Sequence, residues 1–272
     1  MPRVYHLHLV SDATGETLNT VARALTVQFE GVTAKEHSYA LVRNRRQLAR
    51  AIKHIATNPG IVFFTLVNPT LRTLLERECG ALRIPYVSIL DQAAQALREY
   101  LGVEESHRPG GQHEVDARYM ERVEAVNYAI HQDDGQGVEH LCSSEVILVG
   151  PSRTSKTPTC VYLAIRGVRA ANVPVVPGVP LPEQLFEQNE ILIVGLWASS
   201  ERLAQVRRNR LTTMGETRGI DYVDEILIRS EVMEARRLYE RHDWPSIDVT
   251  RRSIEETAAT ILNLLAERNE DG

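Results

Sequence analysis

The sequence has few cysteines and no long apolar run. Cys79, Cys142 and Cys160 are too few for a disulfide framework, and their spacing is not that of metal ligands, so we expect structural roles for all three. No apolar stretch approaches the roughly 18–20 residues of a membrane span, and Met1 leads into a predicted strand without a signal-peptide core. We therefore expect a cytoplasmic protein that does not enter the membrane.

An excess of positive charge is also absent. The 272 residues include 31 Lys and Arg against 36 Asp and Glu, which gives a formal net charge of −5. Such a chain has no overall positive field to attract nucleic acid, so we expect no nucleic-acid partner. With 43% hydrophobic and 25% charged residues, the composition is that of a globular protein long enough for two α/β domains.

What the sequence does contain is a regular alternation of apolar strands and amphipathic helices. In the N-terminal part, strands are predicted at 4–10, 37–42, 60–67 and 85–90, and helices at 16–29, 45–56, 69–79 and 91–101. This alternation favours a mostly parallel sheet covered on both faces. Gly, Pro, His and Glu dominate 102–111, which predicts that the N-terminal α/β domain ends at residue 102.

A second α/β domain of the P-loop type is predicted at 144–272, after a connecting loop and helix at 103–143. Its strands are predicted at 146–149, 170–176, 190–196 and 246–249, and its later helices at 200–210, 222–242 and 253–267. The last helix opens with the capping box of Ser253 and Glu256. The predicted fold class is therefore α/β throughout.

The most informative motif follows the strand at 146–149. Its residues, which we expect to bind a nucleotide, are Gly150, Pro151, Ser152, Arg153, Thr154, Ser155, Lys156 and Thr157. Gly150, Lys156 and Thr157 match the phosphate-binding loop G-x-x-x-x-G-K-[ST]. In such a loop, N–H groups and a helix N-terminus surround phosphate, a lysine on a solvent-facing turn reaches the terminal phosphates, and a hydroxyl binds Mg²⁺.

Two positions depart from that pattern. Ser155 replaces the second glycine, and a left-handed backbone there would cost about 1–2 kcal/mol relative to glycine. Its side chain also predicts a pocket shortened toward two phosphates. Pro158 disfavours a helical conformation in the residue before it, so we expect Thr157 to cap a helix that begins at Pro158. The alternative is a capped turn that binds nothing.

The acidic residue that would hold Mg²⁺ is harder to place. P-loop enzymes often carry an aspartate after a neighbouring strand, but the strand at 190–196 runs into Trp197. Asp248 is the nearest substitute, although a structural role is the simpler interpretation. Asp133 and Asp134 can hold Mg²⁺ or accept a proton from an attacking hydroxyl. They can also simply form a turn, and the local sequence favours the turn.

Three further groups of polar residues each allow two interpretations. A substrate or partner contact competes with helix capping for Ser11, Asp12, Thr14 and Thr17. Metal binding competes with simple packing, which is favoured, for His6 and His8. Phosphate or partner binding competes with a solvated helix face for Arg202, Arg207, Arg208 and Arg210.

Taken together, these motifs resemble the regulatory proteins of pyruvate, phosphate dikinase and of phosphoenolpyruvate synthase. The resemblance covers almost the whole chain and rests on residues 10–18, 116–125, 133–135, 150–158, 162–164, 170–174, 194–196, 247–250 and 253–258. The family usually has Val at Pro151 and His at Gln132. His131 stands one place earlier, so its role is open.

The resemblance implies a bifunctional enzyme and, usually, a homodimer. As a serine/threonine kinase it would transfer the β-phosphate of ADP to a threonine beside the catalytic histidine of the dikinase, which inactivates the target. The opposing activity would remove that phosphate with inorganic phosphate and release pyrophosphate. The expected catalytic residues are Lys156, Arg153, Asp133 and Asp134, and the expected ligand of Mg²⁺ is Thr157 or Ser152.

The dikinase is the favoured target. The sequence Thr-Ser-Lys-Thr at 154–157 resembles the dikinase branch, because the synthase branch tends to have Cys-Gly-Lys-Thr. The synthase is the alternative target. A non-catalytic module that binds a partner when ADP is bound is an alternative of another class.

Overall fold

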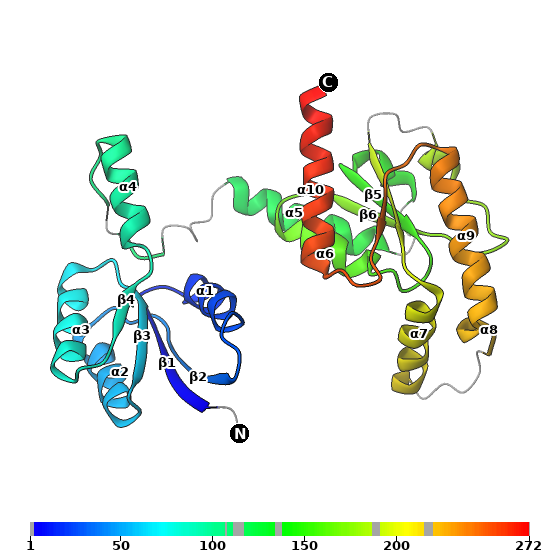
Figure 1. Ribbon diagram of the computed structural model, residues 1–272. Helices are drawn as coiled ribbons and strands as arrows, with labels where there is room; N and C mark the ends of the chain where they lie inside the picture. Colours follow the sequence, from blue (N-terminus) through cyan, green and yellow to red (C-terminus); the bar gives the residue numbers. More distant parts are fainter. Residues whose placement is uncertain are drawn as a thin grey trace. The chain divides into compact units, whose positions relative to one another are not determined.

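A computed structural model describes residues 3–106, 108–110, 117–133, 138–186, 191–214 and 220–271. The chain divides into two compact units, Met1–Glu114 and Val115–Gly272. Each unit contains a four-stranded sheet whose strands are all parallel, which confirms the predicted α/β class (Figure 1). Helix α5 (Ala117–His131), predicted within the connecting segment 103–143, belongs to the second unit.

The sheet of the first unit has the strand order β2-β1-β3-β4. Its strands are β1 (Arg3–Ser11), β2 (Val32–Tyr39), β3 (Gly60–Thr65) and β4 (Tyr86–Ser88), and its helices are α1 (Glu16–Thr26), α2 (Arg45–Thr57), α3 (Pro69–Ala81) and α4 (Asp91–Leu101). Every predicted element is present. The strand predicted at 37–42 lies earlier, at 32–39, because β2 pairs with β1 along nearly its whole length.

Helices cover both faces of this first sheet. On one face, Leu9 of β1 packs with Leu18 of α1. The next residue, Val10, points to the opposite face, as strand geometry requires, and there it packs with Leu48 of α2 and Leu75 of α3. Figure 1 shows α1 on one side of the strands and α2 and α3 on the other.

A stack of histidine rings lies on the α2 face of the first unit. The ring centroid of His37 is 5.0 Å from that of His6 and 4.8 Å from that of His8, which is fully buried. His8 Nε2 donates to the carbonyl oxygen of Asn58 at 2.8 Å, so its Nδ1 accepts from the Tyr39 hydroxyl at 3.1 Å. His6 and His8 are therefore packed residues, the favoured interpretation.

The second unit has the strand order β6-β5-β7-β8. Its strands are β5 (Val146–Gly150), β6 (Ala170–Pro174), β7 (Leu192–Trp197) and β8 (Ser246–Asp248). After α5, its α-helices are α6 (Lys156–Ile165), α7 (Ser200–Met214), α8 (Ile220–Val223), α9 (Glu225–Arg241) and α10 (Ile254–Asp271), with short 3₁₀ helices η3 (Val138–Ser143) and η4 (Glu183–Leu185). Both sheets change winding direction beside their first strand, and ligands of open α/β sheets usually bind at that point.

The end of β5 is fixed by close contacts with β7 and α9. A Cβ atom on Gly195 would overlap the ring of Tyr239, and one on Gly150 would collide with the carbonyl oxygen of Leu196. The buried Tyr239 hydroxyl is shared between the carbonyl oxygens of Val149 and Leu196, each at 3.1 Å. Only glycine fits at these two positions, and the loop after Gly150 therefore starts from a rigid point.

The helix α10 is preceded by the capping box that the sequence predicts. The predicted capping box is confirmed, because the Ser253 N–H donates to Glu256 Oε2 at 2.8 Å and the Glu256 N–H donates to Ser253 Oγ at 3.1 Å.

Cys79 and Cys160 are buried, and Cys142 is exposed. Burial raises the pKa of the Cys79 thiol to about 11. Within the described residues, no helix has the length and apolar character to cross a membrane.

Candidate functional site

The 150–157 loop joins β5 to α6 at the switch point of the second sheet. Ser155 has a left-handed backbone, with φ of 61°, and caps α6, which begins at Lys156. The prediction that Thr157 caps a helix beginning at Pro158 is therefore wrong. The left-handed turn at Ser155 directs the chain into the helix before Pro158 is reached, and the Thr159 N–H closes the first turn on the Ser155 carbonyl at 3.1 Å.

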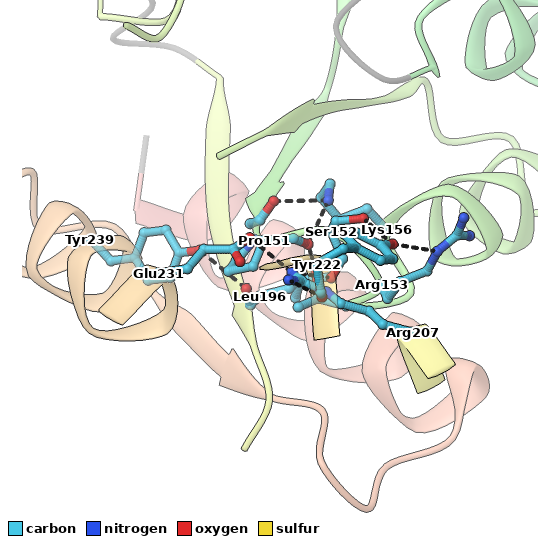
Figure 2. Close-up of polar contacts among 11 residues, drawn as sticks. Pro151, Ser152, Arg153, Lys156, Leu196, Arg207, Tyr222, Glu231 and Tyr239 are labelled. Atoms are coloured by element: carbon cyan, nitrogen blue, oxygen red, sulfur yellow. Dashed lines mark hydrogen bonds and ion pairs between the residues drawn. The ribbon is translucent and has the colours of Figure 1, made fainter. Parts of the chain in front are cut away.

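Side chains hold three successive carbonyl groups of the loop (Figure 2). Lys156 Nζ donates to the carbonyl oxygens of Gly150 at 2.8 Å and Pro151 at 2.9 Å. Arg207 Nη2 donates to that of Ser152 at 3.1 Å. The C=O and N–H groups of a trans peptide point in opposite directions, so these contacts turn the N–H groups of Ser152 and Arg153 away from Lys156 and Arg207.

Those N–H groups are available to an anion. Among the described residues, the N–H groups of Ser152, Arg153 and Ser155 have no hydrogen-bond acceptor. Arg153 has φ of 73° and Ser155 has φ of 61°, and left-handed residues alternating with others gather successive N–H groups into an anion-binding concavity. The N-terminus of α6 adds a favourable dipole. This loop is suited to bind phosphate.

Lys156 occupies a different environment from the expected one. Its side chain is only 5% exposed, so the prediction of a lysine on a solvent-facing turn is wrong. The ammonium lies against the carbonyl groups at the start of its own loop. These carbonyl oxygens, rather than water, accept its hydrogen bonds. The charge is therefore held beside Gly150 and Pro151.

The structure brings Asp133 to the loop. Its Oδ1 accepts hydrogen bonds from Thr157 Oγ1 at 2.7 Å and from Asn172 Nδ2 at 2.5 Å. Asn172 lies in β6 with 1% of its surface exposed, and its N–H donates to the Gln132 carbonyl oxygen at 3.3 Å. The chain at the end of α5 is thus attached to the sheet beside Thr157. Asp134 lies outside the described residues.

Asn172 was missed by the sequence analysis. The signal was a single amide inside an otherwise apolar strand, since β6 reads Ala-Ala-Asn-Val-Pro. A buried amide needs hydrogen-bond partners, and here it holds a carboxylate in place. The hydroxyl of Thr157 and the carboxylate of Asp133 together supply oxygen atoms, the ligand type that Mg²⁺ prefers.

Arg207 of α7 holds the loop at the Ser152 carbonyl group. It is 3% exposed and forms an ion pair with Glu231 of α9 at 2.9 Å, while its guanidinium carbon lies 4.8 Å from the ring centroid of Tyr222. The solvated-face interpretation is therefore wrong for Arg207, although Arg202, Arg208 and Arg210 are exposed. The available signal was its position four residues after Leu203, which is fully buried.

Tyr222 of α8 connects this support to the tip of the loop, as Figure 2 shows. Its hydroxyl lies 3.2 Å from Ser152 Oγ and accepts from Arg153 Nε at 3.3 Å. Arg153, one of the expected catalytic residues, is exposed at the rim of the loop. Nothing in the sequence pattern around Tyr222 indicated this contact.

Two other candidate residues lie apart from this network. The carboxylate of Asp248 accepts from the Thr250 N–H at 2.9 Å, and the Thr250 hydroxyl accepts from the Ser199 N–H at 2.9 Å. Asp248 therefore forms a turn after β8, as its structural interpretation requires. His131 is exposed, and its Nδ1 donates to the Asn127 carbonyl oxygen on the same helix at 2.7 Å.

The polar residues after β1 do not cap α1. The helix follows Gly15, which has φ of 81°, and no side chain caps it, so capping by Asp12 or Thr14 is wrong. Asp12 is 2% exposed and accepts from the Val67 N–H at 2.8 Å. Together with Ser11 and Thr17, it lines a cavity of about 190 Å³ in the first unit. For Ser11, Asp12 and Thr17, contact with a substrate or partner stays a prediction.

The fold is that of an α/β protein, and the comparison with known families assigns it to the kinase-like phosphotransferases. The sequence matches the family described as kinase/pyrophosphorylase over residues 7–262, and the chain belongs to that family. Relatives provisionally named pyruvate, phosphate dikinase regulatory protein are similar over nearly the full chain. The protein of Caulobacter vibrioides is 55% identical over 96% of this chain and 83% of its own length. That of Maricaulis maris is 51% identical over 97% and 94%, and that of Hyphomonas neptunium is 50% identical over 98% and 96%.

Proposed function

We propose that the protein is a bifunctional regulator of pyruvate, phosphate dikinase. It uses ADP to phosphorylate a threonine beside the catalytic histidine of the target, and it uses inorganic phosphate to remove that group. The observation that carries the proposal is the hydrogen bond between Thr157 and Asp133, which places a carboxylate at the phosphate-binding loop. Family membership and the names of the relatives support it.

The loop supplies most of the binding energy for the phosphates of ADP. The N–H groups of Ser152, Arg153 and Ser155 donate hydrogen bonds to the phosphate oxygens, and Lys156 neutralises charge that develops on the transferred group. Arg153 adds a second cation at the exposed rim. Thr157 would hold Mg²⁺, with Asp133 orienting its hydroxyl, and the ion would supply charge neutralisation between the phosphates.

The forward reaction moves one phosphoryl group and one proton. The threonine hydroxyl oxygen of the target attacks the β-phosphorus of ADP, and the bond from that phosphorus to the bridging oxygen breaks. AMP leaves with the electron pair, and the hydroxyl proton passes to Asp133. Oδ1 of Asp133 is held by Thr157 and Asn172, so we assign the proton to its second oxygen, Oδ2.

The opposing reaction uses the same residues. An oxygen of inorganic phosphate attacks the phosphorus of the phosphothreonine and gives its proton to Asp133, and pyrophosphate forms as the threonine oxygen leaves and takes that proton from Asp133. Both reactions place a pyrophosphate-like chain on the loop, so one site serves both. The family resemblance also supports a homodimer, which sedimentation of the purified protein would test.

The test compares two acids that were both candidates. Asp133→Asn removes the proposed base, and Asp248→Asn is the matched control because Asp248 only forms a turn. We expect Asp133→Asn to reduce kcat for transfer from β-labelled ADP by about 10²–10⁴-fold, with ADP affinity changed much less. Dikinase and phosphoenolpyruvate synthase, each phosphorylated on its catalytic histidine, serve as parallel acceptors.

Three results would contradict the proposal. Equal loss of rate in both Asn variants would assign Asp133 a structural role. Transfer from γ-labelled ATP without transfer from β-labelled ADP would remove ADP as the donor. Transfer to the synthase alone would replace the proposed target.

A further inference from the structure

Arg207 reaches the phosphate-binding loop from α7 and is itself held by residues of α8 and α9. Its Nη2 donates to the Ser152 carbonyl oxygen at 3.1 Å and to Glu231 Oε1 at 2.9 Å, and its Nη1 donates to the Tyr222 carbonyl oxygen at 3.4 Å. Arg207 and Glu231 form an ion pair that is almost excluded from water. The positive charge is therefore balanced within the protein, which suits Arg207 to hold the loop rather than to bind phosphate directly.

One unpaired donor indicates what sets the position of the Arg207 side chain. Among the buried side-chain atoms of the described residues, Arg207 Nε alone has no hydrogen-bond partner. Buried polar groups are nearly always paired, because an unpaired one lowers stability. The guanidinium lies where Nη2 reaches both Ser152 and Glu231, although this position leaves Nε without an acceptor.

The turn that Arg207 holds has a geometry that its own residues disfavour. Residues 152 and 153 are the centre of a turn between Pro151 and Thr154, and the Thr154 hydroxyl donates to the Pro151 carbonyl oxygen at 2.9 Å. Arg153, at the third position, is left-handed with φ of 73°, whereas Ser152 is not left-handed, which is the pattern of a type II turn. That third position favours glycine, so an arginine there needs an interaction that holds it.

The competing type I turn would reverse the peptide group at the centre of the turn. The two types differ mainly by a rotation of about 180° of the peptide between the second and third residues. In the observed turn, the Ser152 carbonyl group meets Arg207, and the Arg153 N–H points the opposite way, into the anion-binding concavity. After the rotation, a carbonyl oxygen would replace that N–H and would repel a phosphate.

We propose that Arg207 is a positioning residue that selects the phosphate-binding conformation of the loop. Its hydrogen bond to the Ser152 carbonyl group offsets the cost of the left-handed conformation at Arg153, and this keeps the Arg153 N–H directed to the anion. Tyr222 supports this arrangement, because its ring lies 4.8 Å from the guanidinium carbon and its hydroxyl contacts the side chains of Ser152 and Arg153. The assignment rests on the proposed function in one respect, which is that the loop binds the phosphates of ADP.

The test removes this hydrogen bond without leaving a buried charge unpaired. Arg207→Met combined with Glu231→Gln removes one charge of each sign, so the net charge of the protein stays the same. We expect this double substitution to raise the Kd for ADP, measured by calorimetry, at least about tenfold. The circular dichroism spectrum should remain that of the wild type.

Substitutions at Arg153 separate a positioning role from a general packing role. Arg153→Gly removes the strain of the left-handed conformation, so in that background the double substitution should change the Kd for ADP by less than about threefold. Arg153→Ala removes the same charged side chain but keeps the Cβ and its strain. In the alanine background, the loss of affinity should therefore stay at least about tenfold.

The outcomes distinguish this assignment from the proposed function. An equal loss of ADP affinity in the glycine and alanine backgrounds, or no loss after the double substitution alone, would overturn the positioning role. Because the binding measurement needs no acceptor protein, a wild type that binds ADP without phosphorylating the dikinase would contradict the proposed function only. A wild type that does not bind ADP would overturn both.

Discussion

At the scale of single residues, Ser155 is the clearest departure from the phosphate-loop pattern. Its left-handed backbone strains any residue with a Cβ, and its side chain is exposed. We expect Ser155→Gly to raise the free energy of unfolding by about 1 kcal/mol, measured by urea denaturation. If the side chain also shortens the pocket, calorimetry should show ATP gaining affinity relative to ADP.

Ser155→Ala is the control for this variant. It removes the hydroxyl but keeps the Cβ, so neither the stability gain nor the change in nucleotide preference should appear. A gain with alanine equal to that with glycine would show that backbone strain is not the cause. An ATP to ADP affinity ratio that is the same in Ser155→Gly and the wild type would show that Ser155 does not set the choice of nucleotide.

The residues of the loop could be predicted because their spacing is itself the signal. Lys156 and Thr157 follow from a motif whose chemistry depends on sequence distance. The partners of the loop could not be predicted in the same way. Asn172 and Arg207 lie far from it in sequence, and only the parallel pairing of β5 with β6 and the packing of α7 on α9 bring them to it.

At the scale of elements, the histidine stack on β1, β2 and α2 makes the first unit sensitive to pH. Burial lowers the pKa of His8, and burial together with neighbouring histidines lowers that of His37, from an ordinary value of 6.5. The unfolded chain therefore binds more protons than the folded one as the pH falls below about 6.5. We expect the stability of this unit to decrease in that range.

Hydrogen exchange of peptides from β1 and β2 at pH 7.5 and 5.5 measures this effect. His37→Gln should reduce the difference between the two pH values, whereas His131→Gln, which changes an exposed histidine of the second unit, should not. Both tryptophans, Trp197 and Trp244, belong to the second unit, so their fluorescence reports its unfolding separately. Equal protection of β1 and β2 at both pH values would contradict the prediction.

Element boundaries show where sequence signals were sufficient. Helix α4 occupies its predicted range, 91–101, whereas the single helix predicted at 222–242 is divided into α8 and α9. Asp224 separates them, because its side chain accepts the Ile226 and Leu227 N–H groups and caps α9. An acidic residue in a helical pattern is compatible with both a cap and a surface position, and only the folded chain distinguishes them.

At the scale of the whole molecule, the nucleotide site that we propose lies on one unit, Val115–Gly272. Asp133, Arg207 and Tyr222, whose side chains form hydrogen bonds with the 150–157 loop, all belong to Val115–Gly272. We expect a fragment of residues 115–272 to fold, by circular dichroism, and to bind ADP with a Kd within about threefold of that of the full chain. A folded fragment that has lost ADP affinity would show that the first unit contributes to the site.

The contact of Gly195 with the Tyr239 ring has a consequence for the descent of this protein. A methyl group at position 195 overlaps the ring, and the hydroxyl of that ring spans the ends of β5 and β7 where Gly150 admits the Leu196 carbonyl. Position 195 cannot accept a larger side chain while Tyr239 stays as it is, and position 150 cannot accept one whatever residue stands at 239, because its Cβ would meet the backbone carbonyl of Leu196. A substitution at 195 is therefore tolerated only after a smaller residue has arisen at 239, whereas Gly150 is constrained independently of both.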